Sequence, residues 1–231
     1  MTPSSKAKVL LVEDDASIAF IVKDNLEDRG YEVVYCVDGE TGWQQFMRNN
    51  FDICLLDVML PKKDGLALAA QIRKKNETVP ILMLTALGSD ESKIAGFQKG
   101  IDDYITKPFN IQELLLRMEV FLKRTQKKSE PMEEPVPIGN LFFDFRNLQL
   151  KNEHETIQLT QREAELFRYF YQNKNTVLKR EDILTKIWGK DDYFLGRSMD
   201  VFITKLRKYI KGQPGIEIQT IHGVGFKMIV S

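Results

Sequence analysis

Short apolar runs in the first half of the chain are each followed at once by a polar side chain that could take part in chemistry. Glu13 and Asp14 follow the first run, and Asp57 follows a run near the middle of this half. Thr85 and Lys107 follow two later runs. Three carboxylates brought together repel one another, and they stay ionised together only if a cation compensates them. Oxygen ligands favour Mg²⁺, which keeps several waters and binds through one or two carboxylates.

The chemistry that such a group would support is phosphoryl transfer to a carboxylate. A carboxylate beside Mg²⁺ and a lysine can attack phosphorus and form an aspartyl phosphate. This reaction depends mainly on positioning and charge neutralisation, which Mg²⁺, Lys107 and the Thr85 hydroxyl could supply. The competing interpretation is that all five residues are caps and turn formers. That explanation is adequate for each residue alone, but it does not explain why all five stand at the ends of strands.

Alternating strands and helices are expected to position these residues. Parallel strands need helix-sized crossovers, so the alternation predicts a five-stranded doubly wound parallel sheet with helices on both faces. In such sheets the site lies beyond the carboxyl ends of the strands, where all five polar residues fall. The expected strands are around 8–12, 31–37, 53–57, 80–84 and 104–106, and the expected helices are around 18–26, 43–47, 66–72, 90–99 and 111–122.

Composition excludes several classes of protein. The chain has 231 residues, of which 43% are hydrophobic and 29% charged, so it can bury a core. No apolar run approaches the roughly 20 residues that cross a bilayer. The N-terminal residues 1–5 lack a signal-peptide core, so we expect a cytoplasmic protein without membrane association. Cys36 and Cys54 are interpreted as buried apolar groups, and the two histidines, His154 and His222, argue against a zinc site.

Charge divides the chain into two parts with different expected partners. Residues 1–124 carry 16 basic and 19 acidic side chains, whereas residues 138–231 carry 15 and 11. Between them, residues 125–137 are polar and proline-containing, with almost no bulky apolar side chain. We therefore expect one domain at 1–124, a linker at 125–137 and a second domain at 138–231.

The second domain has the pattern of an α+β winged helix-turn-helix. Short apolar segments between 141 and 159 predict an antiparallel meander. Thr160 and Glu163 have the spacing of a capping box that opens a helix. Two further helices, the second basic, precede a hairpin that turns at Gly223–Gly225. The basic helix would enter the major groove and the hairpin wing would meet the flanking backbone. The alternative is a small α+β domain with a solvated basic helix.

Longer motifs carry a family resemblance. The stretches Leu11–Asp15, Leu55–Gly65, Leu84–Ala86 and Gly100–Phe109 resemble a CheY-like receiver domain. The stretches Leu159–Glu163, Arg197–Lys208 and Thr220–Phe226 resemble the DNA-binding module of the OmpR/PhoB family. The chain is thus identified as a member of the OmpR/PhoB family of two-component response regulators. The resemblance implies a transcriptional regulator and not an enzyme, beyond its own Mg²⁺-dependent aspartyl phosphorylation and dephosphorylation.

The resemblance also assigns receiver residues. Asp57 would accept phosphate from a sensor histidine kinase, and the Lys107–Pro108 peptide bond would be cis. The Mg²⁺ ligands would be Glu13 (through water), Asp14, Asp57 and the backbone carbonyl of Met59. Thr85 would contact the phosphate, and Tyr104 would rotate inward behind Thr85. Lys107 would pair with the Asp57 carboxylate. Phosphorylation would favour a two-fold dimer, with intersubunit pairs Lys93–Glu113, Asp103–Arg117 and Asp102–Arg124.

The same resemblance implies double-stranded promoter DNA as a partner, and allows RNA polymerase as another. The candidate DNA contacts are Arg197, Ser198, Thr204, Lys205 and Arg207 on the helix, with Thr220 and His222 on the wing. Asp200 is expected to hold a structural pair. The chain departs from the family where Phe202 replaces a common His, Thr204 a frequent Arg or Lys, and His222 the usual wing Arg. A mostly neutral imidazole neutralises little phosphate, so we expect a shallow salt dependence.

Three alternative functions share part of this sequence pattern. A haloacid-dehalogenase-type phosphatase would need a second Asp two residues after the nucleophile, where Met59 stands. An RNA-binding output would call for stacking aromatics, which the pattern lacks. A transcription regulator whose receiver is controlled by a partner without phosphorylation is the main alternative. The complete acidic set argues against it, because a receiver of that kind has no need of the metal.

Overall fold

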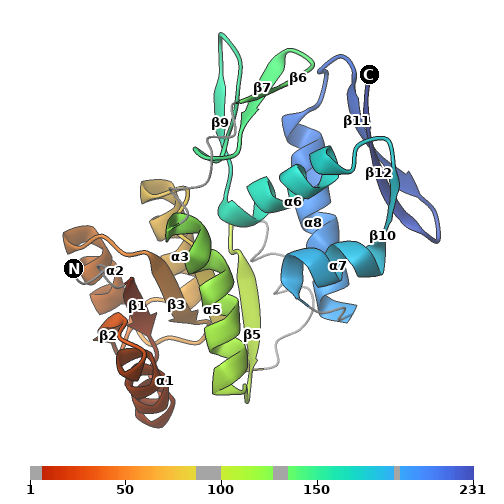
Figure 1. The fold of residues 1–231 in the computed structure, drawn as a ribbon. Coiled ribbons are helices and arrows are strands. Elements are labelled where there is room, and N and C mark those ends of the chain that lie inside the picture. The colour runs from red at the N-terminus through yellow and green to blue at the C-terminus, as the bar shows by residue number, and fades with distance from the viewer. Residues whose placement is uncertain (1–6, 87–99, 127–134, 190–192) are drawn as a thin grey trace, which may run out of the picture. The chain divides into compact units, whose positions relative to one another are not determined.

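The computed structural model describes residues 7–86, 100–126, 135–189 and 193–231, without the side chains of 123–126, 193–195 and 197. The chain divides into two compact units, 1–130 and 131–231 (Figure 1), and each is described by itself. The division falls inside the segment that was predicted to be a linker.

The first unit is built on a five-stranded parallel sheet in the order β2-β1-β3-β4-β5. The strands are β1 (Lys8–Val12), β2 (Glu32–Cys36), β3 (Ile53–Asp57), β4 (Ile81–Ala86) and β5 (Asp103–Lys107). The central strands are almost wholly apolar and buried, as expected for a sheet covered on both faces. The order reverses between β1 and β3, which places a site beyond the carboxyl ends of these two strands.

Helices cover both faces of this sheet, as the alternation predicted. The helix α1 (Ala16–Asp28) and the helix α5 (Ile111–Gln126) contact each other and share one core with strand residues such as Leu55. The helices α2 (Gly39–Arg48) and α3 (Gly65–Lys75) contact each other and lie on the other face of the sheet, formed by the strand residues that alternate with those in this core. The expected doubly wound fold is confirmed. The helix expected around 90–99 lies outside the described residues.

Three aspartates begin the helices that follow β1, β2 and β3. Asp15 accepts from the Ser17 amide at 2.8 Å and begins α1. Asp38 begins α2 by accepting from the Thr41 amide at 2.8 Å, and Asp64 begins α3 in the same way. Their side chains satisfy amides that have no partner inside the helix. These carboxylates are therefore structural caps, which sets them apart from Glu13, Asp14 and Asp57.

Among its described residues, the second unit has a four-stranded antiparallel meander, three helices and a three-stranded sheet (Figure 1). The capping box predicted at Thr160 and Glu163 is present, and Gly189 ends the second helix at φ 84°. The elements are β6 (Val136–Ile138), β7 (Leu141–Asp144), β8 (Gln149–Lys151), β9 (Thr156–Gln158), α6 (Gln161–Gln172), β10 (Val177–Lys179), α7 (Arg180–Trp188), α8 (Tyr193–Tyr209), β11 (Ile216–Ile221) and β12 (Gly225–Val230).

The structure adds two short strands that the sequence pattern did not show. β10 pairs with β12 and widens the hairpin into a sheet. Val136 and Pro137 were assigned to the linker, but they belong to β6, since Val136 pairs with Phe143 at the edge of the meander. Pro137 is tolerated there since an edge strand need not donate every amide. β6 lies in the proline-containing stretch and β10 stands directly before α7, and neither has a strand pattern of its own, so both strands were missed.

Candidate functional site

The carboxyl edge of the receiver sheet brings an acidic pair and a lysine together. Lys107, at the end of β5, donates from Nζ to Asp57 Oδ2 at 2.6 Å and to Glu13 Oε1 at 2.7 Å. Glu13 follows β1 and Asp57 ends β3, so three strands contribute one residue each. All three side chains are largely buried, with exposed fractions of 14% for Lys107, 7% for Asp57 and 0% for Glu13. The convergence predicted for these residues is present.

Burial and mutual charge shift the pKa values in this group. Burial, reinforced by the Asp57 carboxylate and opposed by Lys107, raises the pKa of Glu13 from 4.5 to about 7. Burial acts to lower the pKa of Lys107, but its hydrogen bonds to Asp57 and Glu13 outweigh that effect and raise it. The lysine therefore stays charged and compensates part of the negative charge around Asp57.

The carboxylates of this pocket have the arrangement of a divalent-metal site. One oxygen from each of Glu13, Asp14 and Asp57 lies within 4.8 Å of the others. Within the described part of the chain, Glu13 Oε2 is buried and has no hydrogen-bond partner. A buried carboxylate oxygen needs a partner, and a hard cation with oxygen ligands would supply it. These residues thus fit a divalent cation.

The other predicted receiver residues, Thr85, Tyr104 and Met59, differ in their burial and hydrogen bonds. Thr85, the residue after the Leu84 that pairs with Asp57, is 5% exposed, and its hydroxyl donates to the carbonyl oxygen of Ala86 at 2.7 Å. The ring of Tyr104 is buried, which raises the pKa of its phenol well above the usual range. The backbone amide of Met59 donates to Asp57 Oδ1 at 3.1 Å. The Lys107–Pro108 bond is cis, as predicted.

The charged face expected around β5 and α5 is partly buried. Asp103 is 1% exposed and pairs within its own chain with Arg117 at 2.7 Å, and Arg117 also pairs with Glu113 at 2.9 Å. Asp103 and Arg117 were predicted to pair between two subunits, whereas here they pair within one chain, and the Arg117 guanidinium is what makes the burial of Asp103 tolerable. Lys93 and the side chain of Arg124 lie outside the described residues, so their intersubunit pairs remain predictions.

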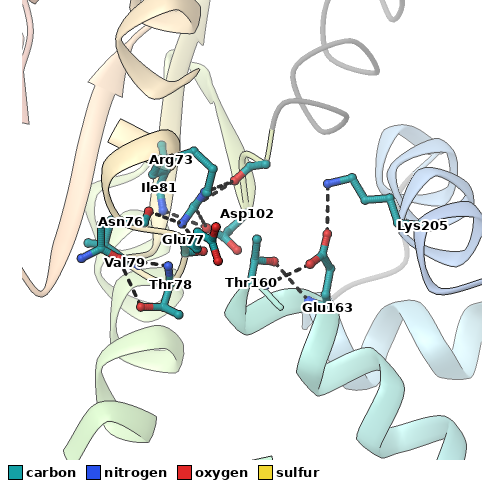
Figure 2. A network of polar contacts seen from close by, with 11 residues as sticks. Arg73, Asn76, Glu77, Thr78, Val79, Ile81, Asp102, Thr160, Glu163 and Lys205 are labelled. Atoms are coloured by element: carbon teal, nitrogen blue, oxygen red, sulfur yellow. Dashed lines mark hydrogen bonds and ion pairs between the residues drawn. The ribbon is translucent and has the colours of Figure 1, made fainter. Parts of the chain in front are cut away.

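Asp102 is also buried, through a network that sequence reasoning missed (Figure 2). Its Oδ2 accepts from Arg73 at 2.9 Å and from the Ile81 amide at 2.9 Å. Arg73 further donates to the carbonyl oxygens of Gly100, Asn76 and Glu77. The guanidinium joins the end of α3 to the segment that leads into β5. Only its position in the last turn of a helix, where cations are favoured, could have drawn attention to Arg73.

On the second unit, the helix α8 and the wing are joined by Arg207. Its Nε donates to the carbonyl of Ile218 at 2.8 Å and its Nη2 donates to Thr220 Oγ1 at 2.7 Å. Thr220 and His222 are exposed on the hairpin. Arg207 thus links two of the predicted DNA-contacting elements.

The remaining predicted contacts on α8 differ in exposure. Thr204 is exposed and its hydroxyl donates to the carbonyl of Asp200 at 2.8 Å. Ser198 is 3% exposed, and the side chain of Arg197 lies outside the described residues. Asp200 holds the structural pair that was expected, with both carboxylate oxygens bonded to Arg180 at 2.8 and 3.0 Å.

Lys205, one of the predicted DNA contacts, is partly buried against α6. Its Nζ donates to Glu163 Oε1 at 3.0 Å, and its side chain is 19% exposed (Figure 2). Glu163 also accepts from the Thr160 amide as part of the capping box and from the Tyr209 hydroxyl. Lys205 therefore compensates a buried carboxylate at the start of α6.

Comparison with known proteins agrees with both halves of the chain. Residues 9–119 match the family model described as "Response regulator receiver domain", and residues 154–228 match "Transcriptional regulatory protein, C terminal". The chain is 42% identical over 224 residues to the transcriptional regulatory protein RprY of Bacteroides fragilis, covering 97% of this chain and 95% of the relative. It is 36% identical over 220 residues to the transcriptional regulatory protein CiaR of Streptococcus pneumoniae, covering 95% and 96%.

A solved structure shows the same organisation. The response regulator DrrB of Thermotoga maritima, titled an OmpR/PhoB homolog, is 30% identical with a TM-score of 0.50, covering 98% of this chain and all of that one. Fold, acidic pocket and comparisons together define a receiver domain joined to a winged-helix DNA-binding domain. The chain belongs to the OmpR/PhoB family of two-component response regulators, as its motifs indicated, and it is a transcription regulator.

A regulator of this class implies two partners, a kinase and DNA. Among the described residues, none of the helices has the length and apolar character that a membrane span requires.

Proposed function

We propose that Asp57 is the phosphoacceptor of this regulator and that a sensor histidine kinase is the donor. The observation that carries the proposal is the contact of Lys107 with both Asp57 and Glu13 at the carboxyl edge of the sheet. Asp57 is the carboxylate that ends the central strand, and the amide of Met59 holds its Oδ1. The other oxygen faces the lysine, which neutralises charge that builds up on a transferring phosphoryl group.

The transfer can be written with these groups. A carboxylate oxygen of Asp57 attacks phosphorus, the bond from phosphorus to the kinase imidazole nitrogen breaks, and that nitrogen keeps the electron pair. Lys107 stays protonated and pairs with the new negative group. Hydrolysis of the acyl phosphate by water later restores Asp57. The chain would thus take part in its own phosphorylation and dephosphorylation without acting on another substrate.

Mg²⁺ is the cation that we propose for this pocket. The ligands from this chain would be Asp14, Asp57 and the Met59 carbonyl, with Glu13 acting through water. All are oxygen donors, which Mg²⁺ prefers. When bound, the ion would neutralise charge on the phosphoryl oxygens. The buried Glu13 Oε2 supports this proposal, because it has no hydrogen-bond partner in the described part of the chain.

Phosphorylation would favour a dimer, and the dimer would bind DNA. RNA polymerase would be a further partner, and the protein would act in the cytoplasm. The helix α5 exposes Leu116 (65%) and Val120 (41%), one turn apart beside the Arg117–Glu113 pair. An apolar patch with charged neighbours is suited to a symmetric contact. In sedimentation velocity, phosphorylated wild type should dimerise, whereas phosphorylated Leu116→Ser should remain monomeric. A dimer of normal affinity in that variant would exclude this surface.

Labelling with acetyl phosphate tests the phosphoacceptor. Wild type should gain one acid-stable, base-labile phosphoryl group. Its formation should require Mg²⁺ and should not occur when EDTA is added before the acetyl phosphate. Asp57→Asn should gain none, whereas Asp52→Asn, a control at an exposed carboxylate near the start of β3, should label normally. Labelling of the Asp57→Asn variant would refute the assignment. Promoter binding unaffected by phosphodonor would favour a regulator controlled by a partner without phosphorylation.

A further inference from the structure

The loop between Asp57 and α3 contains an unusual backbone conformation at Lys62. This residue has φ 63°, in the left-handed region that glycine adopts freely and that side chains with a Cβ disfavour. The loop also carries Met59, whose carbonyl is among the proposed metal ligands. A backbone held in a disfavoured conformation needs surrounding contacts that enforce it.

A buried aspartate on the neighbouring helix supplies one such contact. Lys62 Nζ lies 2.6 Å from Asp38 Oδ2, and the Asp38 side chain is 3% exposed. The other oxygen of Asp38 caps α2 by accepting from the Thr41 amide. The hydrogen bond from Lys62 is the first of the interactions that lower the pKa of Asp38 to about 2, so the carboxylate is charged at neutral pH. Asp38 therefore joins the loop to the first turn of α2.

The next residue strengthens the same attachment. Lys63 Nζ pairs with Glu40 at 2.9 Å and donates to Gln71 of α3 at 2.9 Å. The backbone of the loop also lies directly against α2, since a Cβ added at Gly39 would be 2.2 Å from the carbonyl oxygen of Lys63. Two consecutive lysines thus attach the loop to the helices on either side of it.

The far end of the loop is equally constrained. A Cβ added at Gly65 would lie 1.8 Å from the carbonyl oxygen of Asp57, and the Gly65 amide donates to Val58 at 3.0 Å. The loop therefore has little room to move at its ends. Its middle, from Met59 to Lys62, is held by the Met59 amide on Asp57 Oδ1, by the Leu60 amide on the Val58 carbonyl oxygen and by the Lys62–Asp38 pair.

We infer that Lys62 and Asp38 are positioning residues for divalent-metal binding at Asp57. The pair holds the Lys62 backbone at positive φ, and this conformation sets the direction in which the Met59 segment faces the acidic pocket. The inference rests on the proposed function, because it assumes that this pocket binds Mg²⁺. It adds a role for two residues that neither ligate the metal nor touch the phosphoryl group.

Two substitutions at Lys62 separate backbone conformation from charge. Lys62→Ala and Lys62→Gly both remove one positive charge, which by electrostatics alone can only favour binding of a cation. Alanine leaves a Cβ at positive φ without the Lys62–Asp38 pair that holds this conformation, whereas glycine accepts it without strain. Any difference between the two variants therefore reports on the loop backbone.

The experiment is calorimetric titration of the unphosphorylated full chain with MgCl₂. Lys62→Gly should bind within about twofold of wild type. Lys62→Ala should bind about fivefold more weakly than Lys62→Gly, a difference of about 1 kcal/mol. Lys74→Ala removes an exposed lysine that lies on α3, outside the loop, and this variant should bind Mg²⁺ as wild type does. Equal affinities for the alanine and glycine variants would overturn the inference.

Asp38→Asn provides a second test with the helix cap retained, since the amide oxygen can still accept from Thr41. Loss of the Asp38 charge weakens cation binding in any background, so Asp38→Asn should weaken Mg²⁺ binding more in the wild-type background than in the Lys62→Gly background, where the pair is already absent. An equal loss in both backgrounds would also overturn the inference. If wild type itself shows no Mg²⁺ binding, the proposed metal site fails and the inference fails with it, whereas normal wild-type binding with equal alanine and glycine variants refutes the inference alone. Circular-dichroism melts verify that each variant is folded.

Discussion

Replacing Lys205 by methionine separates two roles for this side chain. The family resemblance assigns it to DNA, whereas the structure places its ammonium group 3.0 Å from Glu163. Methionine keeps much of the apolar stem and removes only the charge. If the structural role is right, the variant should lose stability while the electrostatics of DNA binding stay the same.

The size of the stability loss follows from the burial of the pair. Glu163 is 2% exposed and Lys205 is 19% exposed. Removing one partner of a buried pair destabilises a protein by about 3–5 kcal/mol, because it leaves a charge that is not compensated. Glu163 keeps the Thr160 amide and the Tyr209 hydroxyl as donors, which offset part of this loss. We therefore expect a decrease of about 2–3 kcal/mol in the free energy of unfolding.

Urea denaturation followed by fluorescence measures this decrease, with Lys208→Met as the matched control. Lys208 is exposed on the same helix, and its replacement should change the free energy of unfolding by less than about 0.5 kcal/mol. In a Glu163→Gln background, Lys205→Met should have a much smaller effect, because no buried charge remains. This double-mutant cycle isolates the pair from other consequences of the substitution.

The salt dependence of binding to a duplex of arbitrary sequence provides the second readout. A lysine that neutralises a phosphate contributes about 0.9 to the slope of log K against log salt concentration. We expect the slope for Lys205→Met to equal that of wild type. Wild-type stability together with a slope shallower by about 0.9 would refute the structural role and restore Lys205 as a DNA contact.

Three further predictions concern both domains. His222→Arg should tighten binding to duplex DNA and steepen its salt slope by about 0.9, and an unchanged slope would remove the wing from phosphate contact. Gly65→Ala should destabilise the receiver by about 1–3 kcal/mol in urea denaturation, because the new Cβ would meet the Asp57 carbonyl oxygen; wild-type stability would contradict that close approach. Without metal, Glu13→Gln should become more stable than wild type as pH rises from 5 to 8, by up to about 3 kcal/mol. In the folded wild type the pKa of Glu13 is raised to about 7, so its protonated form contributes a stability that is fully present below pH 4.5 and is lost as the pH rises through 7. A stability difference between wild type and Glu13→Gln that does not vary with pH would contradict this.

Several local features could be predicted directly from neighbouring residues. The capping box at Thr160 and Glu163 was predicted because both partners stand three residues apart on one helix turn. Most of the short strand β6 was assigned to the linker because its three residues, one of them proline, show no strand pattern, although its partner β7 is the next strand. β10 was not predicted because its partner β12 is far away in the sequence, with Val177 paired to Lys227. Asp102 was predicted to pair with Arg124 of a second subunit, and its contact with Arg73 was missed for the same reason, since Arg73 is 29 residues away in the sequence.

By itself, the sequence determined the order of strands and helices, the division into two domains and the residue types at the end of each strand. These depend on periodicity and on neighbours a few residues apart. Only the tertiary structure decided that Lys107 joins Glu13 and Asp57, 94 and 50 residues away, and that Lys205 neutralises Glu163 instead of remaining exposed. A lysine has the same charge at either kind of position. Which carboxylate it meets depends on how elements far apart in the chain pack, because that packing sets both the distance and the exclusion of water.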